Sequence, residues 1–422
     1  MDLNERFEYS EHSLEDLEQF RDENGFIDLT KAGVTLTDAS REYIGNQERI
    51  KNWVNFNGTK VIIKGEALFE GEKNYGIYAE LIIEEIAKKM GIPVAHYDLV
   101  KMLDENGNIV PGVLSVSVVD RDKGEHLESL HAIIGDEPPN SRQQDDTTGF
   151  EYTVNKLREV LLAEGYSEET VENLIVDYKK RTAFFLRVAD ADKHTENVAF
   201  IKGIDEQGKP TIRLAPIFDS ESALLLDINK STITELVGNG VGIFNAVDGV
   251  YPRIAVCKTE EEGGYGEPWA DTLDAIIEDD ELYDYVTEIV NQPIDMDEIF
   301  ESVEKRIGAK LPEDLKEIAG AAFRFRGSSM EEVLDGSYSK GNNLLNSIVD
   351  KGKKSVGTTD LFSVFQSLGI QLNLGTTEKS DKNKDDGPRH RWWRMIIFKN
   401  KNEKIKIKIK IKIAYNYMKA WK

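Results

Sequence analysis

The chain has 422 residues, 40% of them hydrophobic, and carries a formal net charge of −24 at pH 7. This length allows two or three domains with substantial cores, and the negative charge argues against a body that binds nucleic acid or anionic membrane. The single cysteine, Cys257, excludes an internal disulfide framework and a cysteine-rich zinc site. No apolar run approaches the roughly 20 residues that cross a bilayer, and the N-terminus is not of the secretory kind. We therefore expect a cytoplasmic protein.

Residues 1–35 predict an acidic helical extension that packs on the outside of the next domain. Ser13 and Asp16 stand three residues apart, close to the capping-box pattern that begins many helices. Apolar residues follow at helical spacing. Nothing in this segment indicates chemistry.

Residues 36–120 combine strand patterns with one helix. Asn57-Gly58 is a strong hairpin signal, and the stretch "TKVIIKGE" around Lys64 has the two-residue period of a strand. The stretch "NYGIYAELIIEEIAKKMGIPV", which contains Glu80, has helical spacing and ends in a glycine–proline signal. We expect a small, mostly antiparallel sheet with a single helix. Lys64 and Glu80 could pair over that sheet; a solvent-facing lysine is the alternative.

Residues 121–355 read as mostly helical, with one polar loop between an apolar helix and a strand. In "RTAFFLRVADADKHTENVAFI" this loop contains Asp192, His194 and Asn197, and a second strand-like run ends on Asp219. If the two strands pair as a hairpin, Asn197 and Asp219 come close together, with Asp192 nearby.

This set of polar residues suits phosphoryl transfer. The reaction needs a carboxylate that orients the attacking hydroxyl, and oxygen ligands for magnesium between the phosphates. Magnesium takes a few hard oxygen donors and keeps water and phosphate as its other ligands. The alternative is that these residues only cap a helix and form turns, because Asp and Asn are ordinary turn residues.

Residues 356–422 predict a C-terminal helix followed by a basic low-complexity tail. From Thr376 to Lys422 there are 15 basic residues against 5 acidic ones. The alternation of Lys and Ile in "KIKIKIKIKI" has the period of an amphipathic strand. Its simplest interpretation is an extension outside the folded unit, and its charge would also suit contact with an anionic surface.

In this order along the chain, the motifs resemble those of the HipA-like serine/threonine kinases, bacterial enzymes with two lobes, and the similarity covers roughly residues 40–350. "GNQERIK" is similar to the family's phosphate loop, "VIIKGE" to its ATP-lysine strand and "VSVVDRD" to its hinge. "DADKHTENVAF" is similar to the catalytic loop, and "LAPIFDSES" to the metal-binding segment. The short N-terminal part resembles compact, stand-alone members.

The resemblance implies an α+β, two-lobed, protein-kinase-like fold and transfer of the γ-phosphate of ATP, with Mg²⁺, to the hydroxyl of an unidentified protein substrate. It implies a catalytic Asp192, magnesium ligands Asn197 and Asp219, and cofactor-binding residues Gly45, Asn46, Gln47, Lys64, Glu80, Val119 and His194. His194 is expected to hold the loop rather than to transfer protons. A small-molecule or lipid kinase of the same fold, and a non-catalytic nucleotide-binding module, remain as alternatives.

Overall fold

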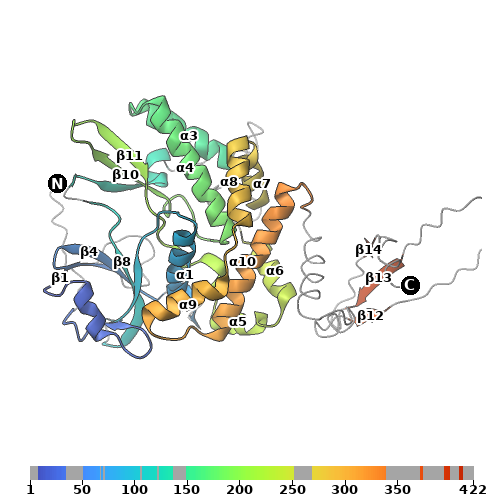
Figure 1. The fold of residues 1–422 in the computed structure, drawn as a ribbon, viewed down its shortest axis with the longest axis horizontal. Coiled ribbons are helices and arrows are strands. Elements are labelled where there is room, and N and C mark those ends of the chain that lie inside the picture. Colours follow the sequence, from blue (N-terminus) through green and yellow to red (C-terminus); the bar gives the residue numbers. More distant parts are fainter. Residues whose placement is uncertain are drawn as a thin grey trace, which may run out of the picture. The chain divides into compact units, whose positions relative to one another are not determined.

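The computed structural model describes eleven stretches of the chain, and the functional site lies in the first of two compact units. The described residues are 8–34, 51–66, 68–69, 72–104, 107–120, 123–135, 149–250, 269–338, 371–373, 394–399 and 408–411. The first unit is Met1–Asn343 and the second is Leu344–Lys422. Within the first unit we call the part up to residue 120 the small lobe and the part from 123 to 338 the large lobe (Figure 1).

The small lobe is built on a six-stranded sheet in the order β1-β3-β4-β8-β7-β2. Its strands are β1 (Glu8–Ser10), β2 (Ile27–Asp28), β3 (Lys51–Phe56), β4 (Thr59–Gly65), β7 (Tyr97–Leu103) and β8 (Ile109–Val116). The four central strands pair antiparallel, whereas β1 and β2 run parallel to β3 and β7 at the edges. Because side chains alternate across a strand, one face collects an apolar cluster that includes Val54, Phe56, Val61 and Ile63.

The predicted hairpin turn joins β3 to β4. Asn57 and Gly58 both have positive φ, +45° and +95°. This is the type I′ geometry that suits the twist of the paired strands and that Asn-Gly adopts at low cost. The turn sets the register of the strand that carries Lys64.

The prediction of a helical extension over residues 1–35 is only partly right. The helix is present as the 3-10 helix η1 (Glu15–Phe20), and Ser13 and Asp16 exchange hydrogen bonds as in a capping box. The same segment also supplies β1 and β2, which the sequence analysis does not predict. They form because the open edges of β3 and β7 offer backbone partners, a long-range feature that two or three residues do not encode.

Helix α1 (Gly76–Lys89) lies between the sheet and the large lobe (Figure 1). It follows a short hairpin of β5 (Leu68–Phe69) and β6 (Glu72–Lys73). It contacts β7 on one side and helix α9 of the large lobe on the other, so it is buried on two faces. The helix ends where the sequence predicts, just before Gly91, whose φ of +68° favours glycine.

The large lobe consists of helices around one three-stranded sheet. The helices are α2 (Leu130–Ile134), α3 (Gly149–Ala163), α4 (Glu168–Arg187), η5 (Ala223–Leu225), α5 (Lys230–Leu236), α6 (Gly240–Asp248), α7 (Trp269–Ile277), α8 (Asp280–Asn291), α9 (Met296–Ile307) and α10 (Glu313–Leu334). The sheet has the order β11 (Pro210–Leu214), β10 (Ala199–Ile204), β9 (His126–Ser129) and contains the predicted hairpin. Among the described residues, no helix is both long and apolar enough to cross a membrane.

Helix α4 delivers the chain to the polar loop at residues 190–197. Its last turns are buried, with Phe184 and Leu186 fully inaccessible to solvent. Arg187 donates a hydrogen bond to the carbonyl of Phe323 on α10 (2.5 Å), and its guanidinium lies 3.6 Å from the centre of the Phe323 ring. The start of the loop is therefore fixed to the long central helix of the lobe.

The second unit contains a three-stranded antiparallel sheet of β12 (Gln371–Asn373), β13 (Arg394–Lys399) and β14 (Lys408–Ile411). The last strand lies in the Lys/Ile repeat, in line with its strand period. The C-terminal helix expected at the start of residues 356–422 falls outside the described residues. The domain boundaries after residues 35, 120 and 355 remain predictions.

Replacing Gly112 with alanine should destabilise the strand that carries Lys64. Gly112 on β8 pairs with Gly65 on β4, and a Cβ atom there would lie 2.1 Å from the carbonyl oxygen of Lys64. Since that obstacle is backbone, the strands must separate, and we expect the free energy of unfolding to fall by about 1–3 kcal/mol in urea denaturation.

Gly203→Ala is the matched control for this substitution. Gly203 also lies in a strand, β10, but an added Cβ would meet the Thr211 hydroxyl at 3.3 Å as its nearest neighbour. We expect a smaller change there. Equal losses of stability in the two variants would contradict the clash at Gly112.

Candidate active site

Lys64 lies at the centre of the candidate site and is bonded across the two lobes. Lys64 lies on β4, and only 6% of its surface is exposed to solvent. The ammonium Nζ is 2.7 Å from Asp219 Oδ1 and 3.7 Å from Glu80 Oε1. The structure thus brings together Lys64 and Glu80, as expected from the sequence, and it adds Asp219 from 155 positions further along the chain. The alternative of a solvent-facing lysine is excluded by its burial.

Glu80 is buried on α1 and faces both Lys64 and the segment that follows Asp219. Its Oε2 accepts a hydrogen bond from the backbone N–H of Ser220 at 2.8 Å. Burial raises the pKa of the Glu80 carboxyl to about 7, although the charge of Lys64 opposes the rise. The nearby carboxylates of Asp219 and Glu221 add to the rise. Glu80 is therefore poised between charged and neutral forms near neutral pH.

Asp219 adopts a backbone conformation that is uncommon outside glycine. Its φ is +58°, in the left-handed region. Its N–H donates to the hydroxyl of Tyr97 at 2.8 Å, and its carbonyl accepts from Lys193 Nζ at 2.5 Å. Together with the ion pair to Lys64, these contacts fix the residue through its main chain and its side chain.

The loop at 190–197 is closed by its own side chains. The carbonyl of Asp192 accepts hydrogen bonds from the N–H of His194 and from Asn197 Nδ2, both at 2.9 Å. His194 Nδ1 accepts the N–H of Glu196 at 3.1 Å, so His194 shapes the loop, in line with its expected role. The Asp192 side chain remains 36% exposed, which leaves it accessible to another molecule.

Lys193 bonds this loop to Asp219, a role that was not predicted from the sequence. It is fully buried, and its Nζ also donates to the carbonyl of Phe218 at 2.7 Å. Asp190 Oδ2 lies 3.4 Å from the same nitrogen, and burial raises the pKa of Asp190 while the charge of Lys193 opposes that rise. The spacing Asp-x-x-Lys within the loop was the available signal, but it does not say that the pair is buried.

Three carboxylates lie close enough together to hold a divalent cation. Oxygen atoms of Glu80, Asp219 and Glu221 lie within 4.8 Å of one another. Glu80 Oε1 is buried without a hydrogen-bond donor. Hard carboxylate donors of this kind fit magnesium. Glu221 was not predicted, although a second acid two residues after Asp219 was visible in "IFDSES".

The remaining predicted residues are placed in different ways. Asn197 donates to Asp192, and its loop is joined to Asp219 through Lys193. Val119 lies between β8 and β9 and packs with Val118 and Phe218 against an apolar cluster on β10 and the chain after β11. The cluster consists of Ala199, Ile201 and Ala215. Gly45, Asn46 and Gln47 lie outside the described residues.

Comparisons with known proteins agree with this architecture. A model of the HipA-like C-terminal domain family matches residues 31–244, just over half of the chain. The crystal structure of a Helicobacter pylori proinflammatory kinase, CtkA, is similar over 70% of this chain and 94% of its own, with a TM-score of 0.50 and 16% identity. At that identity the likeness is one of fold, and it confirms the predicted α+β, kinase-like fold.

A second solved structure is similar over 71% of this chain and 70% of its own, with a TM-score of 0.39 and 13% identity. It is the Shewanella oneidensis MR-1 toxin–antitoxin HipA in complex with HipB and its operator DNA. No curated protein matches the chain.

The raised pKa of Glu80 predicts a pH-dependent stability that Glu80→Gln removes. The folded-state pKa of Glu80, about 7, lies above its ordinary value of 4.5. Below pH 4.5 the carboxyl is protonated in both the folded and the unfolded chain, whereas between pH 4.5 and pH 7 it ionises more readily in the unfolded chain, so the free energy of unfolding falls as the pH rises. A neutral glutamine at this position does not titrate and causes no such fall. We expect the difference in free energy of unfolding, Glu80→Gln minus parent, to rise by about 1–3 kcal/mol between about pH 5 and pH 8, measured by chemical denaturation.

Glu84→Gln, one turn further along α1, is the control for this effect. The pKa of Glu84 is lowered to about 2, so its carboxylate is charged throughout that pH window in both the folded and most of the unfolded chains. Its variant should differ from the parent by a nearly constant amount. A pH-independent difference for Glu80→Gln would show that Glu80 does not titrate near neutrality.

Proposed function

The chain belongs to the HipA-like C-terminal domain family, as its motifs predicted, and from this premise we propose that it is an ATP- and Mg²⁺-dependent serine/threonine protein kinase. It would transfer the γ-phosphate of ATP to a hydroxyl group of a protein. The observation that carries the proposal is the position of Lys64 between Glu80 and Asp219. A lysine on a small-lobe strand, paired with a helix glutamate and facing a metal-binding aspartate, is the arrangement that protein kinases use.

Lys64 serves to hold the phosphates of ATP. The ammonium of Lys64 is buried and already faces two carboxylates, so it is a preorganised positive charge in a place of low solvent access. Glu80 orients it from α1. Asp219, with Asn197 from the loop, holds the magnesium ion, which when bound neutralises charge on the phosphates. Glu221 adds a carboxylate to the same cluster.

Asp192 is the residue that contacts the hydroxyl group of the acceptor protein. Its partly exposed carboxylate orients the attacking hydroxyl and accepts its proton on Oδ. Asn197 Nδ2 donates to the Asp192 carbonyl and lies 3.4 Å from its Oδ2, which restricts the rotation of this side chain. His194 supports the loop that carries both residues.

The hinge offers a surface for the adenine ring. Val118, Val119 and Phe218 are only partly buried where they pack on the small apolar cluster of the large lobe. A flat apolar ring fits such a surface, which is usual for cofactor sites. From their resemblance to the family's phosphate loop, Gly45, Asn46 and Gln47 complete the proposal as further residues that bind the phosphates.

Asp192→Asn and Asp219→Asn should each remove phosphoryl transfer. The first loses the proton acceptor, a contribution of about 10²- to 10⁴-fold, and the second loses the charged metal ligand. Transfer is measured by intact-protein mass spectrometry after incubation with ATP and MgCl₂, with autophosphorylation and mixed protein acceptors as readouts.

Asp205→Asn is the control for these two substitutions. Asp205 caps the turn between β10 and β11 through Oδ1, which accepts the N–H groups of Gln207 and Lys209, and asparagine keeps that oxygen. Its activity should equal that of the parent protein. Full transfer by both site variants would reject the assignment.

A panel of acceptors separates the proposed protein kinase from its alternatives. The fold alone does not choose a substrate. With labelled ATP, we expect label on protein serine or threonine to exceed label on small molecules and on lipid vesicles. Preferential labelling of a small molecule or lipid would indicate a kinase of that class instead. A nucleotide-dependent rise in unfolding temperature with no label on any acceptor would indicate a non-catalytic binding module.

A further inference from the structure

The conformation of Asp219 needs support from its surroundings. A non-glycine residue with φ of +58° is strained, and such strain persists only where neighbouring structure over-determines it. Strained residues are common at functional sites. The supporting groups should therefore be found among the atoms that bond to the main chain of Asp219.

Tyr97 supplies the first of these groups, from the small lobe. The ring is buried on β7, and its hydroxyl oxygen accepts the N–H of Asp219 at 2.8 Å. The chain just before β7 also runs beside Ile217, which donates to the carbonyl of Pro93 and accepts from the N–H of Ala95. The Tyr97 side chain thus extends the contact between these two backbone segments.

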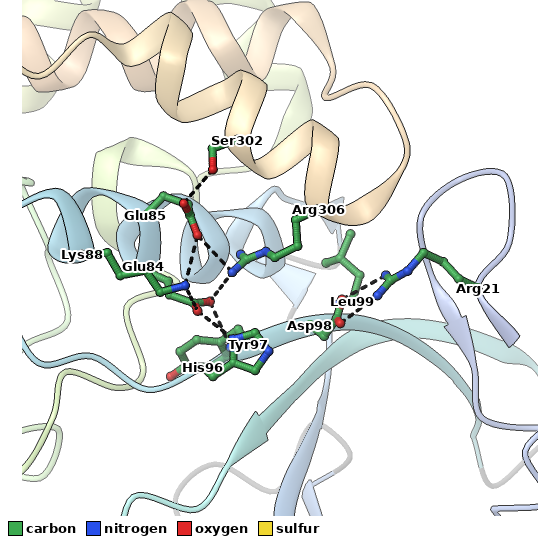
Figure 2. A network of polar contacts seen from close by, with 10 residues as sticks. All are labelled: Arg21, Glu84, Glu85, Lys88, His96, Tyr97, Asp98, Leu99, Ser302 and Arg306. Carbon is green, nitrogen blue, oxygen red and sulfur yellow. Dashed lines mark hydrogen bonds and ion pairs between the residues drawn. The ribbon is translucent and has the colours of Figure 1, made fainter. Parts of the chain in front are cut away.

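A buried carboxylate fixes Tyr97 in turn. Glu84 on α1 is fully buried, and its Oε2 accepts the backbone N–H of Tyr97 at 3.0 Å. Its Oε1 contacts His96 Nδ1 and Lys88 Nζ, each at 2.7 Å. Figure 2 shows the side chains of Lys88 and His96 and the backbone of Tyr97 around the Glu84 carboxylate.

Arg306 joins this network to the large lobe. From α9, its Nη1 lies 2.8 Å from Glu84 Oε2 and 3.2 Å from Glu85 Oε1, while Ser302 donates to Glu85 at 2.7 Å (Figure 2). Burial alone raises the pKa of Glu84, but its hydrogen bond with His96, the charge of Arg306 and the contact with Lys88 lower it to about 2. The carboxylate is therefore charged at neutral pH and holds its partners firmly.

We propose that Tyr97 is a positioning residue that keeps Asp219 in its left-handed conformation, and that Glu84, held by Arg306, keeps Tyr97 in place. The carboxylate of Asp219 is then presented to a divalent cation without rearrangement when nucleotide binds. The role of the cation rests on the proposed function, whereas the role of Tyr97 in holding Asp219 does not.

Tyr97→Phe tests the link directly, because it removes the acceptor and keeps the ring. Loss of one such hydrogen bond should speed amide hydrogen exchange over residues 215–222 by about 5- to 10-fold, measured by mass spectrometry. The affinity for Mn²⁺ in the presence of a non-hydrolysable ATP analogue, measured by electron paramagnetic resonance, should fall by about the same factor. Binding of the analogue without metal should be unchanged.

Tyr178→Phe is the matched control. Tyr178 is another fully buried tyrosine, on α4, stacked against Phe150 in the large lobe. Its variant loses a buried hydroxyl but should leave exchange at residues 215–222 and Mn²⁺ affinity as in the parent protein. Thermal unfolding identifies any variant that has lost its fold. Unchanged exchange and unchanged Mn²⁺ affinity in Tyr97→Phe would overturn the proposal.

Glu84→Gln tests the second link without altering the tyrosine. It weakens the acceptor of the Tyr97 N–H and the ion pair with Arg306, so exchange should quicken at Tyr97 and also over residues 215–222. Faster exchange at Tyr97 alone would show that the network does not act on Asp219. If the parent protein binds no Mn²⁺ with nucleotide, the proposed function fails, and the exchange measurements still decide the role of Tyr97.

Discussion

The ion pair between Lys64 and Asp219 joins the small lobe to the large lobe at the centre of the candidate site. Both groups are mostly removed from solvent, and a buried charge is stable only with a partner and further hydrogen bonds. Lys64 comes from strand β4, Glu80 from helix α1 and Asp219 from the chain after the β10–β11 hairpin. Bringing the three together requires the sheet, α1 and the large lobe to be packed correctly at the same time.

Helix α1 connects the site to the large lobe within one helical turn. Glu80 faces Lys64 and Ser220, and Glu84, four residues later, faces Tyr97 and Arg306. One turn of a helix spans only about 5.4 Å, so the contacts that α1 makes with α9 lie about one turn from Glu80. The two acids differ in electrostatics although they share a helix: Glu80 is short of donors and has a raised pKa, whereas Glu84 is surrounded by donors and has a lowered one.

The sequence was most informative where chemistry is local or follows a motif. Asn57-Gly58 predicted its turn, the spacing of apolar residues predicted α1, and the order of motifs predicted the family and the pairing of Lys64 with Glu80. It was least informative where the partner is distant in the chain. The edge strands β1 and β2 depend on neighbours across the sheet, and the roles of Lys193 and Tyr97 depend on burial and on main-chain atoms of Asp219, which carry no residue-specific signal.

The contacts of Arg306 have a consequence for exchanging parts between relatives. Arg306 is a residue of the large lobe, yet the acids that neutralise it, Glu84 and Glu85, lie on the helix of the small lobe. In a chimera whose small lobe comes from another protein, this guanidinium would lose these two acids and face a different helix. A chimera therefore has to take α9 and α1 from the same parent, although the two helices belong to different lobes.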